Sequence, residues 1–271
     1  MYREYWGLQE KPFENTPDPR FFYLSSEHEE GLSRLLYVIQ ERKGAGILTG
    51  IFGCGKTLLT RALLAQLNKN IYQIALINNP YLKAVELLRS IARMLGAEGL
   101  PEKLTEMSSD FFLQTIGDIL LNNAKDGKET LIIIDEAHVI SDSEVLEELR
   151  LLLNFQSETR FLLTLILIGQ PELLERIHKN KQLEQRIAIG YNLDPLSDKE
   201  TQNYIEHRLK VAGAQRKIFT ESATSSIYQN SGGIPRRINQ ICDMALLTAS
   251  SQGLDKIDDT LIRQAIAGLG L

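Results

Sequence analysis

The sequence predicts an α/β protein whose mostly parallel sheet is followed by an all-helical region. Between residues 45 and 193, short apolar runs of strand length alternate with amphipathic stretches of helical period. A glycine-rich turn separates the first of these runs from the helix that follows it. From Ser197 onward, only helical patterns remain. Because strands that alternate with helices form parallel sheets covered on both faces, we expect that architecture for the first part.

Five apolar runs are expected to form the strands, at residues 45–49, 71–77, 130–134, 160–168 and 187–193. Helices are expected at 27–42, 58–67, 82–95, 110–125 and 143–154, with a short one opened by Pro171. After a boundary near residue 195, helices are expected at 197–212, 220–230, 235–250 and 258–267. Ser197 and Glu200 form a capping box at the start of the first of these. The predicted domains are an N-terminal arm and helix at 1–44, an α/β core at 45–195 and a helical domain at 196–271.

The composition is that of an ordinary globular protein. The 271 residues are 43% hydrophobic, which is enough for a sizeable core, and the net charge of −5 argues against coating DNA through overall charge. Cys54 and Cys242 form no metal-binding pattern and no disulfide framework. The N-terminus has no apolar signal core, and no apolar run approaches membrane-spanning length. We therefore expect a cytoplasmic protein.

The segment from Gly50 to Thr57 matches the phosphate-binding pattern G-x-x-x-x-G-K-[ST] at every fixed position. Its glycines let backbone N–H groups converge on phosphate oxygens, and the N-terminus of the next helix adds a positive dipole. Lys56 is expected to reach the β- and γ-phosphates of ATP, and the Thr57 hydroxyl to ligate Mg²⁺. A plain glycine-rich turn is the alternative, but it explains neither side chain. The residues expected to bind the nucleotide are Gly50, Ile51, Phe52, Gly53, Cys54, Gly55, Lys56, Thr57 and Leu58.

Two acids, Asp135 and Glu136, follow the apolar run that ends at Ile134. Ligand sites in open parallel sheets lie at the carboxyl ends of strands. We expect Asp135 to hold Mg²⁺, usually through water, and Glu136 to orient and polarise the attacking water as general base. His138 completes the letters Asp-Glu-Ala-His of a helicase motif. Because such helicases have two tandem nucleotide-binding folds and this chain has room for one, we interpret His138 as a polar residue near the site.

Residues 1–27 are rich in aromatic residues and prolines. This segment is either an irregular arm that packs on the domain through its aromatic rings or a wall for a nucleotide base. Aromatic and apolar groups suit both interpretations equally well.

Several further motifs accompany the phosphate-binding loop and the Asp135–His138 segment. They are Tyr5-Trp6-Gly7-Leu8, Lys11-Pro12-Phe13, Thr16-Pro17-Asp18-Pro19-Arg20-Phe21, Gly169-Gln170-Pro171-Glu172-Leu173, Gln185-Arg186-Ile187, Pro195-Leu196-Ser197 and Gly232-Gly233-Ile234-Pro235-Arg236-Arg237-Ile238-Asn239. With these motifs, nearly the whole chain resembles an AAA+ ATPase, and more closely the ATPase domain of the general secretion pathway protein A (ExeA) family. The resemblance implies a P-loop NTPase fold of the AAA+ type, with a five-stranded parallel sheet core and a C-terminal all-helical lid domain.

The resemblance also implies roles for one glutamine and two arginines. Gln170 matches sensor 1, which helps to place the water near the γ-phosphate; an amide that caps the next helix is the alternative. Arg186 matches the arginine finger, which would reach a neighbouring subunit's nucleotide and stabilise charge on the transferring phosphoryl group. Arg236 matches sensor 2, on the helical lid. The competing arginines are Arg176 and Arg160 for the finger and Arg237 for sensor 2.

A finger supplied by a neighbour makes hydrolysis depend on assembly, so the resemblance implies a homo-oligomer, such as a ring with ATP at subunit interfaces. We expect an ATPase that couples turnover to the assembly of a secretion or pilus-type envelope complex, peripheral to the inner membrane through its partners. The alternatives are an ATP-dependent DNA-binding regulator of the transposition or replication-initiator type, and a nucleotide-dependent scaffold that barely hydrolyses ATP. The basic residues that form either a DNA patch or a solvated helix end are Arg208, Lys210, Arg216 and Lys217.

The sequence departs from the family pattern at its end. Secretion-system members commonly continue past the ATPase domain into a membrane span and a periplasmic peptidoglycan-binding part, whereas this sequence ends at Leu271, just after the lid. We therefore expect either a truncated form of such a protein or a stand-alone relative.

Overall fold

A computed structural model of the chain describes residues 2–78, 80–100 and 108–270. The chain divides into two compact units. The sheet unit comprises Glu30–Gly50 and Leu59–Leu193, and the helical unit comprises Met1–Glu29, Ile51–Leu58 and Asp194–Leu271. Most of the phosphate-binding loop therefore groups with the C-terminal helices. The predicted domains at 1–44, 45–195 and 196–271 stay a prediction.

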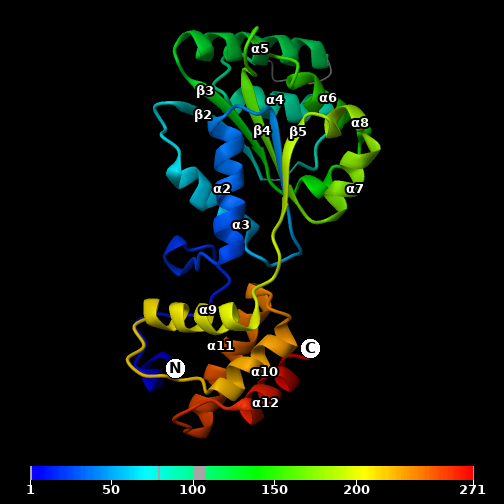
Figure 1. Cartoon of the computed structure of the whole chain (residues 1–271). Coiled ribbons are helices and arrows are strands. Elements are labelled where there is room, and N and C mark those ends of the chain that lie inside the picture. The colour runs from blue at the N-terminus through cyan, green and yellow to red at the C-terminus, as the bar shows by residue number, and fades with distance from the viewer. Residues whose placement is uncertain (1, 79, 101–107, 271) are drawn as a thin grey trace. The chain divides into compact units, whose positions relative to one another are not determined.

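The sheet unit is built on five parallel strands in the order β2-β3-β4-β1-β5 (Figure 1). They are β1 (Ala45–Thr49), β2 (Tyr72–Ile77), β3 (Glu129–Ile134), β4 (Leu163–Gly169) and β5 (Ile187–Asn192). Thr49 at the end of β1 pairs with Gly169 of β4 and with Asn192 of β5, so these strands end at the same edge. The five-stranded parallel sheet confirms the predicted fold class.

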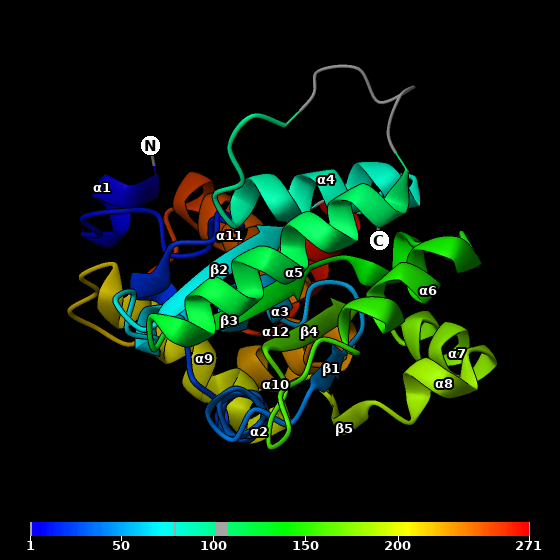
Figure 2. The same cartoon turned by 90° about the horizontal axis from the view of Figure 1, so that it is seen from above.

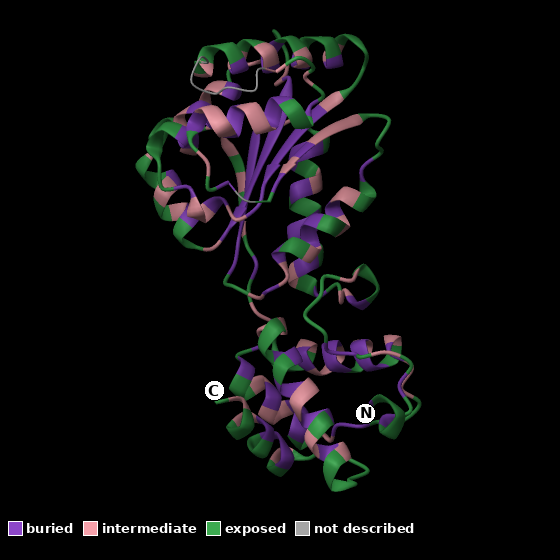
Figure 3. Cartoon of the chain, turned by 180° about the vertical axis from the view of Figure 1, so that it is seen from behind, coloured by how far each residue is buried: buried purple, intermediate pink, exposed green. Residues whose placement is uncertain are grey.

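Helices cover both faces of this sheet (Figures 1 and 2). They are α2 (Ser26–Gln40), α3 (Lys56–Gln66), α4 (Ala84–Met94), α5 (Ser109–Lys125), η3 (Ala137–Val139), α6 (Ser143–Leu152), α7 (Glu172–Lys179) and α8 (Lys181–Glu184). Apolar side chains of α4, α5 and α6 form one core with alternate residues of the strands, and α2 and α3 lie on the opposite face. Every residue of β1 and β4 is buried, as the purple strands of Figure 3 show. Burial on both faces explains why these strands are continuous apolar runs in the sequence.

The helical unit has its own hydrophobic core, to which the N-terminal arm contributes (Figure 3). Its elements are α1 (Tyr2–Trp6), η1 (Pro19–Phe21), α9 (Asp198–Val211), α10 (Glu221–Ser231), α11 (Pro235–Gln252) and α12 (Asp259–Leu269). Trp6 is 3% exposed, and its indole N–H donates to Leu246 O at 3.0 Å. Phe13 is 2% exposed and packs edge-on against Phe219. Trp6 and Phe13 therefore pack the N-terminal arm onto the helical core, which is the first of the two interpretations given for residues 1–27.

Of the four basic residues at and after the end of α9, Lys210, Arg216 and Lys217 are exposed, as a solvated helix end requires, whereas Arg208 is not. Arg208 is only 4% exposed, and its guanidinium donates to Pro12 O at 2.6 Å and to Glu14 O at 2.9 Å. Arg216 lies 3.3 Å from Asp255, and its guanidinium stands over the Trp6 ring. The helix pattern could not reveal this burial, because the carbonyl groups that Arg208 binds come from the N-terminal arm.

Other differences from the sequence-based expectations concern short elements and element ends. Strand β4 begins at Leu163 rather than at residue 160, because Phe161 instead forms an antiparallel bridge with Gln156. The helix α8 was not predicted; Asn180 caps it by accepting a hydrogen bond from the Leu183 N–H at 3.0 Å. The expected capping box of α9 is present, with both reciprocal bonds between Ser197 and Glu200. Among the described residues, no helix is both long and apolar enough to cross a membrane.

Candidate functional site

The phosphate-binding loop follows β1 and leads into α3, as its motif requires. Gly53 and Gly55 have φ angles of 90° and 99°, in the left-handed region that only glycine adopts without strain. Gly55 also has no room for a side chain, because a Cβ atom there would lie 2.7 Å from His28 Nε2. At Gly50, a Cβ atom would lie 2.7 Å from the carbonyl oxygen of Leu193. The loop glycines are therefore required by backbone conformation and by close packing.

Lys56 begins α3 and is only 6% exposed. Its ammonium group turns back over the loop and donates to Ile51 O at 3.2 Å. Thr57 follows it in the first turn of the helix and is exposed. The loop thus combines a lysine ammonium group with the N-terminal end of a helix, and both favour an anion.

Cys54, in the middle of the loop, is 1% exposed. Burial raises the pKa of its thiol to about 11, so the thiol stays protonated at neutral pH. Cys54 therefore contributes its backbone and a small buried side chain to the loop.

Asp135 and Glu136 follow β3 and face different environments. Asp135 is 4% exposed, and its Oδ1 accepts a hydrogen bond from the Glu136 N–H at 2.8 Å. Glu136 has a φ angle of 55°, which is unusual for a residue with a side chain, and its side chain is 39% exposed. The turn therefore keeps the first carboxylate inside and directs the second one outward. Strained backbone of this kind is concentrated at functional sites.

A row of three side chains joins the ends of β3 and β4. The Gln170 amide nitrogen lies 2.8 Å from His138 Nε2, and His138 Nδ1 lies 3.4 Å from Glu136 Oε2. If the amide donates to Nε2, the imidazole is neutral and its Nδ1–H faces the Glu136 carboxylate. The predicted polar residue near the site is thus placed between the expected general base and the expected sensor 1.

The predicted arginine finger and its competitors each have partners inside the sheet unit. Arg186 donates to Leu153 O at 3.0 Å and to Asn154 Oδ1 at 2.9 Å. Arg160 forms an ion pair with Glu129 at 3.1 Å. A finger role for any of them would require the guanidinium to leave such partners.

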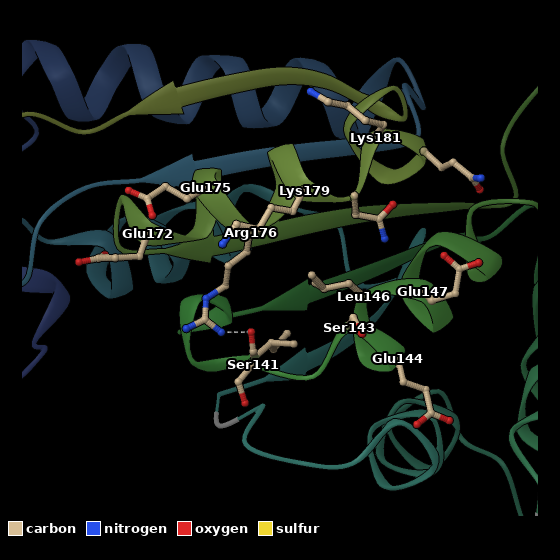
Figure 4. Close-up of a pocket in the computed structure, with 13 residues that line it drawn as sticks. Ser141, Ser143, Glu144, Leu146, Glu147, Glu172, Glu175, Arg176, Lys179 and Lys181 are labelled. Carbon is tan, nitrogen blue, oxygen red and sulfur yellow. Dashed lines mark hydrogen bonds between the residues drawn. The ribbon is translucent and has the colours of Figure 1, made fainter.

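Arg176, the other competitor, lies in a surface pocket of about 1010 Å³ between the segment 140–147 and the helices α7 and α8 (Figure 4). Its guanidinium donates to Ile140 O, drawn as the dashed line in Figure 4. Glu172, Glu175 and Lys179 line the same pocket. The residues expected to bind the nucleotide do not line this pocket, so its size is not evidence for the nucleotide site.

Arg236, the predicted sensor 2, contacts the phosphate-binding loop within the helical unit. Its guanidinium stands 4.1 Å from the centre of the Phe52 ring, a cation–π distance, and its backbone N–H donates to Gly53 O at 3.3 Å. The first residues of α11 and the loop are therefore neighbours.

The structure groups the candidate residues by unit. The helical unit brings Phe52 and Gly53 of the loop together with Arg236. The sheet unit brings Glu136 together with His138 and Gln170. Sequence reasoning missed His28, a buried histidine whose Nε2 lies 3.0 Å from Cys54 O. No sequence signal identifies this contact, because the two residues are 26 positions apart.

In a comparison with known proteins, the family model described as "AAA domain" matches residues 39–177. The chain is 39% identical to general secretion pathway protein A of Aeromonas hydrophila over 274 aligned residues. The aligned region covers 99% of this chain and 49% of that protein. The chain thus spans about half the length of this curated relative.

Solved structures also share the fold. The Aeropyrum pernix ORC2 protein in its ADPNP–ADP complexes matches with a TM-score of 0.68 and 19% identity, over 96% of this chain and 71% of that one. The Drosophila ORC bound to DNA matches with a TM-score of 0.71 and 17% identity, over 97% of this chain and 65% of that one. At these identities the likeness concerns the fold alone.

Proposed function

The chain belongs to the AAA domain family, and from this premise we propose that it binds ATP with Mg²⁺ and hydrolyses the γ-phosphate bond. The observation that carries the proposal is the phosphate-binding loop, in which two glycines with positive φ angles precede a buried lysine at the start of a helix. An anion is the ligand that suits such a loop, because its N–H groups and ammonium group supply only positive charge.

The residues present fit ATP and Mg²⁺ chemically. Thr57 supplies a hydroxyl and Asp135 a carboxylate, which are oxygen ligands of the kind that Mg²⁺ prefers. Among the described residues, no cluster of three or more His, Cys, Asp or Glu side chains could hold a metal ion alone. This suits Mg²⁺ in NTPases, because the nucleotide's phosphates and water supply its other ligands.

Each of the other residues has a proposed role in hydrolysis. Lys56 contacts the β- and γ-phosphates, Glu136 orients and deprotonates the attacking water, and Gln170 helps to place that water. Arg236 contacts the γ-phosphate from the lid, and Arg186 is the finger that reaches the neighbouring subunit's nucleotide. Bound ATP would supply the phosphoryl group, and Mg²⁺ would supply positive charge that offsets the negative charge of the phosphate oxygens.

We further propose that the chain works as a homo-oligomer that couples ATP turnover to assembly of an envelope secretion or pilus-type complex. The proposed coupling to an envelope complex is supported by the match to general secretion pathway protein A along nearly all of the chain. The DNA-dependent alternative has less support, because Arg208, one of the four residues of its expected basic patch, is buried.

The test is ATP turnover by purified protein in magnesium buffer, measured for the wild type and for Glu136→Gln. We expect Glu136→Gln to lower kcat by about 10²–10⁴-fold, as removal of a general base does, and to leave ATP affinity within about twofold. Equal turnover by both proteins would contradict hydrolysis at this site. A second arm adds duplex DNA: a salt-sensitive rise in rate would favour the DNA-dependent alternative over the secretion role.

A further inference from the structure

We propose that His28 is a positioning residue for the phosphate-binding loop, whose backbone it holds in the shape that receives the phosphates. The inference rests on the proposed function, because it assigns the loop to a nucleotide. It adds a residue that lies outside the loop motif, in the first turn of α2.

Hydrogen bonds fix the His28 ring on both of its nitrogen atoms. The ring is buried, with the whole residue 3% exposed, and Nε2 lies 3.0 Å from Cys54 O. Because a carbonyl oxygen can only accept, Nε2 carries the proton and donates it. On the other side, Nδ1 lies 2.6 Å from Ser25 Oγ, which also accepts the His28 backbone N–H at 3.3 Å. Burial lowers the pKa of His28, so the imidazole is neutral at pH 7. With its one proton on Nε2, the ring accepts the Ser25 hydroxyl's hydrogen bond at Nδ1.

This bond determines which way one peptide group of the loop points. The Cys54 C=O and the Gly55 N–H belong to the same planar trans peptide, so they point in opposite directions. A carbonyl held by His28 therefore directs the Gly55 N–H away from the imidazole. In a phosphate-binding loop, the N–H groups must face the anion. The contact with His28 thus selects the orientation that binding needs.

The loop needs such a restraint because of its composition. Gly53 and Gly55 flank Cys54, and glycine has more accessible backbone conformations than any other residue. Ordering a flexible residue costs conformational entropy. A loop that is already ordered before the nucleotide arrives does not lose that entropy on binding, so its affinity is higher.

The segment that carries His28 is itself held to the start of α9. The Ser26 backbone N–H and hydroxyl donate to Glu200 Oε1 at 3.0 and 2.7 Å, and Glu200 belongs to the capping box of α9. The Phe22 ring also packs edge-on against the His28 ring, with 5.3 Å between their centres. His28 therefore connects the loop to the start of α9 through fixed contacts.

The experiment compares the full chain with His28→Ala, His28→Gln and the control His207→Ala. His207 is a histidine of the same unit, and its ring packs beside Tyr23. Two quantities are measured: the Kd of a fluorescent ADP analogue, and amide hydrogen exchange of the peptide that covers residues 50–57 in nucleotide-free protein. Turnover at saturating ATP is measured alongside.

We expect His28→Ala to raise the Kd about three- to tenfold, the loss of one net hydrogen bond, and to speed exchange in the loop. Turnover at saturating ATP should stay within about twofold, because the phosphates reorder the loop once bound. His28→Gln, whose amide can donate to the same carbonyl, should restore most of the affinity. The His207→Ala control should match the wild type in Kd and in loop exchange.

Unchanged Kd and unchanged loop exchange in His28→Ala would overturn the inference while leaving nucleotide binding intact. Equal losses in His28→Ala and His207→Ala would also overturn it, since the effect would then be general destabilisation. If His28→Ala does not fold, failure of a folded His28→Gln to keep the affinity within about threefold of wild type would overturn it. Absence of nucleotide binding by the wild type would instead overturn the proposed function, and this inference with it.

Discussion

At the scale of single residues, the backbone conformation of Glu136 separates two neighbouring carboxylates. Its φ angle of 55° keeps Asp135 buried against the turn while its own side chain reaches solvent. A residue with a side chain pays about 1–2 kcal/mol for this conformation. The two acids can therefore hold different roles although they are adjacent in sequence.

The buried thiol of Cys54 gives a prediction at the same scale. Because its pKa is raised to about 11, about one thiol in a thousand is ionised at pH 8, and the ionised form is the nucleophile. We expect iodoacetamide to label Cys54 in the native protein far more slowly than in urea-denatured protein. Mass spectrometry of the loop peptide measures both rates. Labelling at equal rates would contradict the burial of Cys54.

At the scale of elements, the turn between α10 and α11 depends on two adjacent glycines with different surroundings. Gly232 and Gly233 have φ angles of 61° and 73°. A Cβ atom at Gly232 would meet nothing within 4 Å, whereas one at Gly233 would lie 1.9 Å from Leu196 O. Leu196 also donates its N–H to Gly233 O at 2.9 Å, so the two backbones are closely paired.

We therefore predict that Gly232→Ala and Gly233→Ala differ in stability. The first should lower the free energy of unfolding by about 1–2 kcal/mol, the strain of a left-handed alanine. The second should cost more, because the Cβ atom must also push the paired backbones apart. Urea denaturation of the two variants measures the difference. Similar losses for both would contradict the close approach at Gly233.

The elements that the sequence predicted well are those determined by burial. The strands β1 and β4 are continuous apolar runs because both of their faces are covered, and both ends of β1 were predicted correctly. The helix α8 was missed because four residues are too few for a helical period to be detected. The start of β4 was misplaced because the Gln156–Phe161 bridge is a pairing that periodicity does not contain.

The residues of the candidate site also fall into two groups: those that a local sequence pattern predicted and those that no such pattern marks. The phosphate-binding loop and the two acids were predicted because their residue types are fixed by chemistry at a fixed spacing. His28 was not predicted, because its partner lies 26 positions away and no local pattern marks it. The burial of Arg208 was missed for the same reason, since its acceptors Pro12 and Glu14 belong to the N-terminal arm.

At the scale of the whole molecule, the proposed finger makes hydrolysis a property of the assembly. Arg186 is held by Leu153 O and Asn154 Oδ1 in the single chain, so a neighbouring subunit would have to draw it away. A guanidinium supplied in trans increases phosphoryl-transfer rates by about 10³–10⁵-fold. Assembly and turnover should therefore rise together with protein concentration.

Mixing two inactive variants tests this arrangement. An Arg186→Ala subunit keeps Glu136, and a Glu136→Gln subunit keeps Arg186. An interface should therefore be active where the nucleotide site of an Arg186→Ala subunit receives Arg186 from a Glu136→Gln neighbour. At equal mixing, about a quarter of head-to-tail interfaces have this composition, and we expect about that share of the wild-type rate. The control mixes Arg176→Ala with Glu136→Gln. No recovered activity in the first mixture would rule out Arg186 as a finger in trans.

We propose above all that the loop at residues 50–57 holds the phosphates of ATP. Equilibrium binding of ATP in magnesium buffer tests it most directly, measured for the wild type and for Lys56→Ala. We predict that the wild type binds and that Lys56→Ala binds about 10- to 100-fold more weakly, because a charge-assisted hydrogen bond is lost. No binding by the wild type, or equal binding by both proteins, would contradict the claim.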